Sequence, residues 1–546
     1  MEDHISEVEL VPMDRPSASS KHASMDVSGS VFFISSSGQV LRLPIPSTSP
    51  RDPLTWSRAK RFGACMALQC YSGVCSFEVT VPGILSQAIQ HEFQPEEMGP
   101  FSVSTLSSAM TLFMGFGYLF SIPISTAVGR RPVFLTGAAI TTISTLWAGL
   151  SGSFVQLLVA ICLQAIAVGT AISMCQMMIL DATFIHERPM ALSLYWCAGS
   201  AVIKLFLVVL PFTTDLATQW RPVYEIWFAP CLLAFIIALL FLPETFFLRP
   251  PVALDGRVLV QSASEKVQIY EDWAELSENM DSKPLPDVPQ GSTFLHRAKV
   301  NRAPGTTWRS LPAAYMQMLL CLCNPLIVWV ALLSASILSG VIYLNLTQPG
   351  TLISPPWSQD PERVSIYLGV SGILGSLLAI PAAGPLISWS TRYFALRRNG
   401  IRHAEVYLPG FIPPVLCGVL SVGLFYLVTS QELPALWHYV ASALSIMSYV
   451  SGNVAIVLWM TEAFPNWAAA ALAVQMFTTN MVSFGTGALL LPAVNGGHIK
   501  IPALVIMGLI LGLGAIALPV SFWGKSARQY IHGRWSSMER TALRPQ

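Results

Sequence analysis

Three ionisable side chains interrupt long apolar stretches of this sequence, namely Glu78, Lys204 and Glu225. An ionisable side chain in the hydrocarbon core of a membrane costs ~2.5–3.5 kcal/mol, so each of the three requires a functional or a structural reason. The helical rise of ~1.5 Å per residue places Glu78 ~24 Å and Lys204 ~21 Å from the inner ends of their stretches. Glu225 enters from the opposite side and lies ~5–6 Å below the outer edge of its stretch.

Because the two depths agree, we expect Glu78 and Lys204 to form an ion pair, with Glu225 as an alternative partner. Two roles fit such a pair. In the first, Glu78 exchanges protons while Lys204 contacts an anionic substrate or competes for the carboxylate, so that charge biases the inward and outward conformations. In the second, the pair is a static brace between helices, and breaking it would cost about 3–5 kcal/mol of stability.

A short basic turn, Pro123–Pro132 (PISTAVGRRP), separates two of the apolar stretches. Its length predicts a helix hairpin, and we place it in the cytoplasm because lysine and arginine accumulate on that side of a membrane. Charged residues at the inner mouth of later stretches can pair with its arginines and brace a gate. The residues of this predicted gate are Gly129, Arg130, Arg131, Asp181, Glu187 and Arg188, and Glu462 occupies the equivalent inner end of a later stretch.

Composition places the chain among polytopic membrane proteins. Of its 546 residues 53% are hydrophobic and 11% are charged, and its mean hydropathy is +0.56. We predict an all-α membrane protein with twelve transmembrane helices in two six-helix halves, because each apolar stretch approaches the ~20 residues that cross a bilayer. The predicted spans are 62–85, 102–125, 133–151, 154–178, 190–211, 222–243, 319–346, 364–387, 408–428, 436–460, 468–492 and 502–523.

The distribution of basic residues predicts the orientation. Of the 31 lysines and arginines, 27 lie in segments that we place in the cytoplasm, which puts both termini on that side. Alternating apolar and polar residues predict short hairpins at 30–44 and 256–270. The predicted organisation is a cytoplasmic N-terminal tail (1–61), an N-terminal half (62–243), a cytoplasmic central loop (244–318), a C-terminal half (319–523) and a cytoplasmic C-terminal tail (524–546).

Signatures of catalysis are absent from the sequence. No GxSxG, His-box, HExxH or P-loop pattern occurs, so we expect neither an enzyme nor direct hydrolysis of ATP. Cys65, Cys70 and Cys75 are five residues apart, which scatters them around a helix, so we expect no metal site and no cofactor. A net charge of +1, without basic runs beyond the helix flanks, argues against a nucleic-acid partner.

Segments spread over both halves carry further recognisable patterns. They are SPRDPLTWSRAKR (49–61), WRPVYEIW through FLPET (220–245), GPLISWSTRYFALRRNGIRHAEVYLP (384–409) and TEAFP (461–465). Together with PISTAVGRRP, these segments resemble the major facilitator superfamily, in particular fungal members similar to drug:proton antiporters. In the family pattern G-x-x-x-D-R-x-G-R-R-P, Thr126 and Ala127 stand where the Asp and the first Arg belong.

This resemblance implies alternating access to a substrate site near the midplane between the two halves, with the first and fifth helices as neighbours. Two departures concern proton coupling. The helix-five run G-x-x-x-G-P-x-x-G-G of the antiporters is reduced to Gly199 within AGSAVIKLFL, and Ile161 replaces the Arg of the fourth-helix motif. Uptake therefore remains open beside export.

The predicted function is secondary active transport of a small organic molecule, with proton-driven export of a drug, toxin or secondary metabolite as the favoured form. Proton-coupled uptake of a nutrient such as a polyamine or an organic anion is the alternative, and a non-transporting sensor or scaffold is a further one. The expected partners are the substrate, protons and the lipid bilayer, and we expect a monomer. We expect a multi-pass protein of the plasma membrane or, alternatively, of the vacuolar membrane, with Asn345 as a candidate N-glycosylation acceptor.

Overall fold

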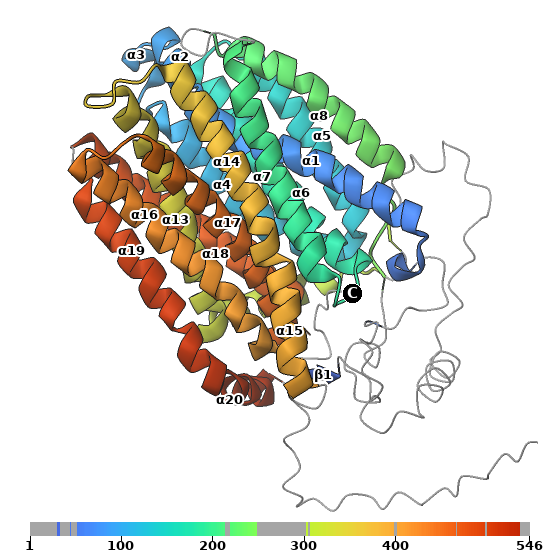
Figure 1. Cartoon of the computed structure of the whole chain (residues 1–546). Coiled ribbons are helices and arrows are strands. Elements are labelled where there is room, and N and C mark those ends of the chain that lie inside the picture. The colour runs from blue at the N-terminus through green and yellow to red at the C-terminus, as the bar shows by residue number, and fades with distance from the viewer. Residues whose placement is uncertain are drawn as a thin grey trace, which may run out of the picture.

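In the computed structural model the chain forms a bundle of long helices (Figure 1). The structure describes residues 30–32, 44, 52–212, 219–247, 302–303, 306–397, 401–465, 467–496 and 499–535. Within these ranges the strands are limited to a short pair, β1 (Ser30–Phe32) and β2 (Ile401–His403), so the predicted all-α class is confirmed. The hairpin predicted at 256–270 lies outside the described residues.

Two polar side chains start the first long helix. The Asp52 carboxylate accepts the N–H of Leu54 (3.0 Å) and caps a 3₁₀ turn, η2 (Pro53–Thr55). The Ser57 hydroxyl then accepts the N–H of Lys60 (3.4 Å) at the start of α1 (Arg58–Ile84). Because the first turn of a helix leaves backbone N–H groups without partners, these caps explain the DPLTWS pattern.

The N-terminal half contains six long helices, and α6 packs against four of the others. Gly117 and Gly169 bring α4 and α6 together, since a Cβ at these positions would come within 2.4 Å of the Ile166 oxygen and 2.3 Å of the Met114 oxygen. Only glycine permits such an approach of two backbones. The helices are α1, α4 (Ser104–Val128), α5 (Arg130–Gly149), α6 (Phe154–Ala182), α7 (Arg188–Val209) and α8 (Arg221–Phe241), with the short α2 (Ser86–Glu92), α3 (Pro95–Met98) and η3 (Leu210–Phe212) between them.

The C-terminal half repeats this design around α17. Gly375 of α14 lies against α17, where a Cβ would come within 2.3 Å of the Ala443 oxygen. A close approach of two backbones therefore occurs in both halves. The elements are α12 (Ser310–Leu322), α13 (Pro325–Ile353), α14 (Pro361–Ala383), α15 (Pro385–Arg397), η5 (Ala404–Phe411), α16 (Ile412–Gln431), α17 (Leu436–Ala463), α18 (Ala468–Asn495), α19 (Lys500–Ala515) and α20 (Ala517–Trp535).

Each of the twelve predicted spans overlaps a long helix. Among the described residues, nine helical segments are long and apolar enough to cross a membrane, and ten if α19 and α20, bent by 42°, form one span. The helices α1 and α18 are also long, with 27 and 28 residues. Two boundaries were predicted wrongly. The seventh span begins at Pro325, because Asn324 caps α13 by accepting the Leu326 N–H (3.0 Å), and the eighth continues through α15 to Arg397.

The two halves meet mainly where α4 packs on α18 and where α7 packs on α14, and Figure 1 shows α7 and α14 running side by side. A further link comes from the tail that precedes α1, since β1 pairs antiparallel with β2, with Val31 opposite Arg402. The hairpin expected at 30–44 is thus replaced, over its first residues, by pairing with the C-terminal half. Most of its remaining residues lie outside the described ranges.

Candidate functional site

Glu78 lies in α1 and points into the interior of the N-terminal half, where its side chain is fully buried. Three neighbouring helices supply hydrogen-bond donors to its carboxylate. Thr145 Oγ1 of α5 donates to Oε1 (2.7 Å), Cys231 Sγ of α8 donates to the same oxygen (3.3 Å), and Gln164 Nε2 of α6 donates to Oε2. Gln164 Nε2 also lies 3.0 Å from Thr145 Oγ1, so the donors form one connected group.

All three donors to Glu78 are electrically neutral. In the described part of the chain, no lysine, arginine or histidine nitrogen lies within 4.0 Å of its carboxylate in an ion pair. Burying a carboxylate without a counter-ion is costly, and taking up a proton removes that charge. The arrangement therefore suits a carboxyl group that binds and releases a proton.

Lys204 points away from Glu78, into the contact between the two halves. Its side chain occupies the space beside Gly372 of α14, where a Cβ would lie 2.8–2.9 Å from the Lys204 Cγ, Cδ and Cε atoms. One turn earlier in α7, Ser200 Oγ accepts a hydrogen bond from Ser376 Oγ of α14 (2.9 Å). Lys204 is therefore a half-buried cation at the seam between α7 and α14.

The predicted ion pair between Glu78 and Lys204 is wrong. Their helices do contact each other, but Glu78 is bound by donors from its own half, whereas the Lys204 side chain lies beside Gly372 of the other half. Glu225 is no partner of Lys204 either: its side chain is exposed at the start of α8, with its Cγ 3.2 Å from the position of a Cβ on Gly149. Depth along a helix does not fix the direction in which a side chain points.

At the predicted cytoplasmic end, Arg130 and Asp181 form an ion pair with Nε and Oδ2 at 2.8 Å, and both side chains are buried. The predicted pairing of these two residues is thus present. Thr245 Oγ1, which follows α8, donates to the same Asp181 oxygen (3.1 Å). The pair joins the start of α5 to the end of α6, so it braces helices within one half.

A second pair crosses between the halves. Arg188 Nη1, at the start of α7, lies 3.5 Å from Glu462 Oε1 at the end of α17, and the side chains are only 5% and 7% exposed. Beside it, Arg61 of α1 pairs with Glu187 at 2.5 Å in a more exposed position. The Arg188–Glu462 pair therefore links the two halves at the predicted cytoplasmic end of the seam.

Glu244 is a site residue that sequence reasoning missed. Its carboxylate accepts the backbone N–H groups of Arg130 (3.1 Å) and Arg131 (3.2 Å), which open α5, and those of Thr245 and Phe246. Burial raises the pKa of Glu244, whereas these donors and the Arg130 charge act in the opposite direction. The sequence signal available for Glu244 was the FLPET ending of the predicted sixth span, but this pattern does not show which groups the carboxylate contacts.

Gly129 makes room for this cap. Its backbone has φ +113°, and a Cβ would lie 2.7 Å from both Glu244 Oε2 and Ala303 Cβ. Arg131, the neighbouring arginine of the predicted gate, donates from Nη2 to the Leu239 oxygen (2.9 Å). The glycine of the turn is therefore required by both its backbone conformation and its neighbours.

The two positions where the family pattern loses its charges are contacted by residues from the later part of the predicted central loop (244–318). Arg302 Nε donates to the Ala127 oxygen (3.0 Å), and Ala303 N donates to the Val128 oxygen (2.8 Å). Thr126 Oγ1 lies 3.3 Å from Ser310 Oγ of α12. The Arg302 guanidinium, a backbone amide and a serine hydroxyl thus contact the end of α4 where the pattern has an Asp and an Arg.

Aromatic side chains also meet across the seam. The rings of Trp196 in α7 and Tyr449 in α17 lie edge to face with centroids 5.9 Å apart, and the ring centroid of Phe116 of α4 lies 5.9 Å from that of Phe477 of α18.

Asn345, the candidate glycosylation acceptor, is exposed but lies within α13, eight residues before the helix ends. Thr347 of its sequon donates to the Tyr343 oxygen inside the helix (2.7 Å).

A membrane bundle of two helical halves, with ionisable and aromatic groups along the seam between them, is the architecture of a transporter. The model of the Major Facilitator Superfamily matches residues 70–488, and the chain belongs to this family. It is therefore a multi-pass membrane transporter and not an enzyme.

Individual relatives are distant. An uncharacterised MFS-type transporter of Schizosaccharomyces pombe is 21% identical over 436 residues, covering 74% of this chain and 72% of that protein. Protein HOL1 of Saccharomyces cerevisiae is 22% identical over 558 residues, covering 92% of each chain.

Among solved structures, the proton:xylose symporter XylE bound to 6-bromo-6-deoxy-D-glucose is similar with a TM-score of 0.57 and 14% identity, covering 86% of this chain and 96% of that one. A partially occluded inward open structure of the xylose transporter XylE from E. coli has a TM-score of 0.52 and 11% identity, with 85% and 97% covered. At these identities the likeness concerns the fold alone.

Proposed function

We propose that this protein is a secondary active transporter that moves a small organic molecule by alternating access and couples this movement to protons through Glu78. The observation that carries the proposal is the buried Glu78 carboxylate, held by three neutral donors and paired with no cation in the described part of the chain. Moving such a group from a dry site to a hydrated site stabilises its charged form far more than its protonated form. A conformational change that hydrates the site therefore exchanges its proton.

The seam between the halves supplies the second element of this mechanism. The Arg188–Glu462 pair links the two halves at the predicted cytoplasmic end, so opening of that end requires the pair to separate. Rocking of one half against the other about a central site is the usual form of alternating access. Protonation of Glu78 would alter the packing of α1 against the remainder of its half and so bias this rocking.

We favour export of a drug, toxin or secondary metabolite, which the likeness of several segments to fungal drug:proton antiporters supports. One observation favours a second candidate, the uptake of an organic anion. Lys204 lies at the seam without an acidic partner among the described residues, and a cation there attracts anions and repels a polyamine. We further propose a monomer in the plasma membrane, with both termini in the cytoplasm.

The test measures flux of a small-molecule panel into and out of vesicles that contain the purified full-length protein, with and without an imposed pH gradient. Substrate movement opposite to the proton gradient indicates export, and movement with it indicates uptake. Flux that ignores pH contradicts proton coupling. Absence of flux for every compound, with normally folded protein, favours the sensor or scaffold alternative.

The variant that addresses Glu78 directly is Glu78→Gln, which keeps an acceptor for Thr145 but cannot carry the charge. We expect Glu78→Gln to abolish accumulation driven by a pH gradient while retaining exchange of labelled for unlabelled substrate, because exchange needs no net proton movement. Glu225→Gln, which changes an exposed carboxylate, is the matched control and should leave both activities intact. Unchanged pH-driven accumulation in Glu78→Gln would refute the assignment.

A further inference from the structure

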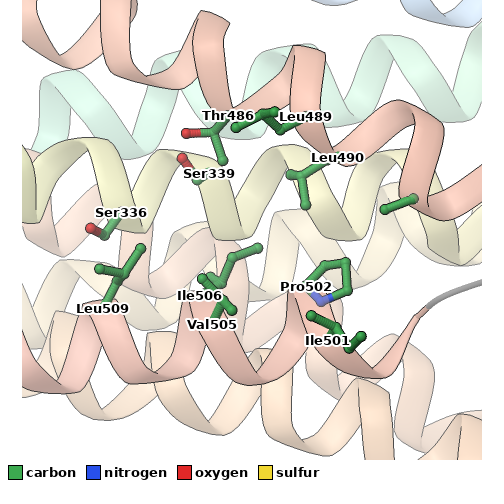
Figure 2. A pocket seen from close by; sticks show the side chains of 11 residues that line it. Ser336, Ser339, Thr486, Leu489, Leu490, Ile501, Pro502, Val505, Ile506 and Leu509 are labelled. Carbon is green, nitrogen blue, oxygen red and sulfur yellow. The ribbon is translucent and has the colours of Figure 1, made fainter.

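A groove lies between α18 and α19 in the C-terminal half, with α13 as its floor (Figure 2). Its volume is about 370 Å³. The walls are almost entirely aliphatic, formed by side chains such as Leu490, Ile506 and Leu509, and the floor carries the two small residues Ser336 and Ser339. Small floor residues and two diverging helices thus leave a hollow along the surface of the bundle.

The polar atoms of the groove already have partners. The hydroxyls of Ser336, Ser339 and Thr486 donate to the backbone oxygens of Leu332, Ala335 and Val482 at 2.7–2.8 Å, each one turn earlier in its own helix. A polar ligand would therefore find no donor that is free of a partner, and water would find few partners. The groove suits an aliphatic chain.

The mouth of the groove faces the surroundings of the bundle. Leu489 and Ile501 line it with side chains that are 78% and 66% exposed. Leu489 lies in α18, a helix of 28 residues, and Ile501 lies in α19, which together with α20 is long and apolar enough to cross a membrane. On α19 the lining runs from Ile501 to Leu509, which is ~12 Å of helix at ~1.5 Å per residue. One leaflet of a bilayer has a hydrocarbon depth of roughly 15 Å, so the lining on α19 is nearly as long as one leaflet is deep.

A cation stands at one end of the groove. Lys500 is the first residue of α19 and is exposed, next to the lining residues Ile501 and Pro502. The N-cap residue Ile499 offers no side-chain cap, and the N-terminal end of a helix carries partial positive charge. The end of the groove therefore attracts an anion.

We propose that this groove binds one phospholipid, with an acyl chain between α18 and α19 and its phosphate at Lys500. The groove matches both parts of the lipid, since its aliphatic walls contact the acyl chain and Lys500 with the first turn of α19 binds the phosphate. The bound chain fills the space between two helices, one of which, α18, packs on α4 of the other half. The lipid thereby supports the wall of the seam.

The experiment uses the full-length protein in nanodiscs that hold a single copy and contain phosphatidylglycerol with a photoactivatable group on its acyl chain. Labelled peptides are identified by mass spectrometry. We expect labelling concentrated on 486–493 and 501–509, and reduced by Ser339→Phe, which fills the floor. If Ser339→Phe does not fold, Leu509→Trp, which narrows the groove from its other wall, serves in its place.

The headgroup contact has its own variant. Lys500→Gln should lower labelling of these segments about fivefold, the effect expected of one basic residue near a membrane surface. Arg363→Gln removes an exposed cation in the first turn of another helix, α14, and should leave labelling unchanged. Labelling spread evenly over all membrane-facing helices would overturn the proposal. Unlabelled lipid in excess should compete for the groove, and competition by a transported compound instead would also overturn the proposal.

Discussion

Replacing Glu462 with glutamine is expected to open the predicted cytoplasmic end of the protein. In the described structure the Glu462 carboxylate lies 3.5 Å from Arg188 of the other half, and the two side chains are 7% and 5% exposed. Glu462→Gln removes the negative charge that faces Arg188, and breaking a buried pair by removing one partner costs about 3–5 kcal/mol. Separation of the halves hydrates Arg188, so this cost falls on the closed conformation alone.

The expected shift follows from that difference. Since ~1.4 kcal/mol corresponds to a factor of ten in an equilibrium, Glu462→Gln should favour the opened conformation by about two to three and a half orders of magnitude. A full inversion of a two-state population from 1:99 to 99:1 requires ~5.5 kcal/mol, so the variant should carry most of the population across. An exposed pair would give only ~0–1 kcal/mol and little shift.

Hydrogen–deuterium exchange of the purified protein measures this opening. Backbone amides at 184–188 and 461–465 should exchange faster in Glu462→Gln, and the charge swap Arg188→Glu with Glu462→Arg should restore slow exchange. Arg363→Gln, which breaks the exposed Asp360–Arg363 pair, is the control without effect. Exchange in Glu462→Gln equal to that of the control would refute the reasoning.

Three further variants test local features. Gly129→Ala should lower the free energy of unfolding by about 1–3 kcal/mol, because only glycine tolerates this backbone conformation. The loss is measured as a lower thermal midpoint, and Gly63→Ala, with open space around it, is the control. Glu244→Ala should lower the free energy of unfolding by about 1–3 kcal/mol. Glu244→Gln should lower it less, since glutamine keeps one acceptor for the start of α5, and equal thermal midpoints for the two variants would contradict the capping role. Gly372→Val should lower the thermal midpoint, and Lys204→Ala should relieve that loss, because the added side chain collides with the lysine stem; additive losses would disprove the contact.

The arrangement of spans could be predicted because hydrophobicity along the chain determines which segments enter a membrane. The boundary error at the seventh span shows where this reasoning stops. Residues 319–324 are apolar enough to belong to a span, but Asn324 and Pro325 end one helix and begin another. Local capping chemistry thus divides a stretch that hydropathy treats as continuous.

The site was predicted less completely. Asp181 and Arg130 were expected to meet because both lie at the same end of their helices, and they do. Glu78 and Lys204 satisfied the same condition of depth but face different neighbours. The direction of Lys204 depends on the absence of a side chain at Gly372, in a helix of the other half. Sequence periodicity within one helix contains no information about such a partner.

Pairing of β1 with β2 also sets an order of assembly during synthesis. The two strands lie about 370 residues apart in the chain, so at a translation rate of about 5–20 residues per second β1 waits roughly 20–75 s for its partner. During that interval the first eight predicted spans leave the ribosome. The strand pair can close only after α14 and α15 have been made, which makes it a late event in biogenesis and a marker that both halves have come together.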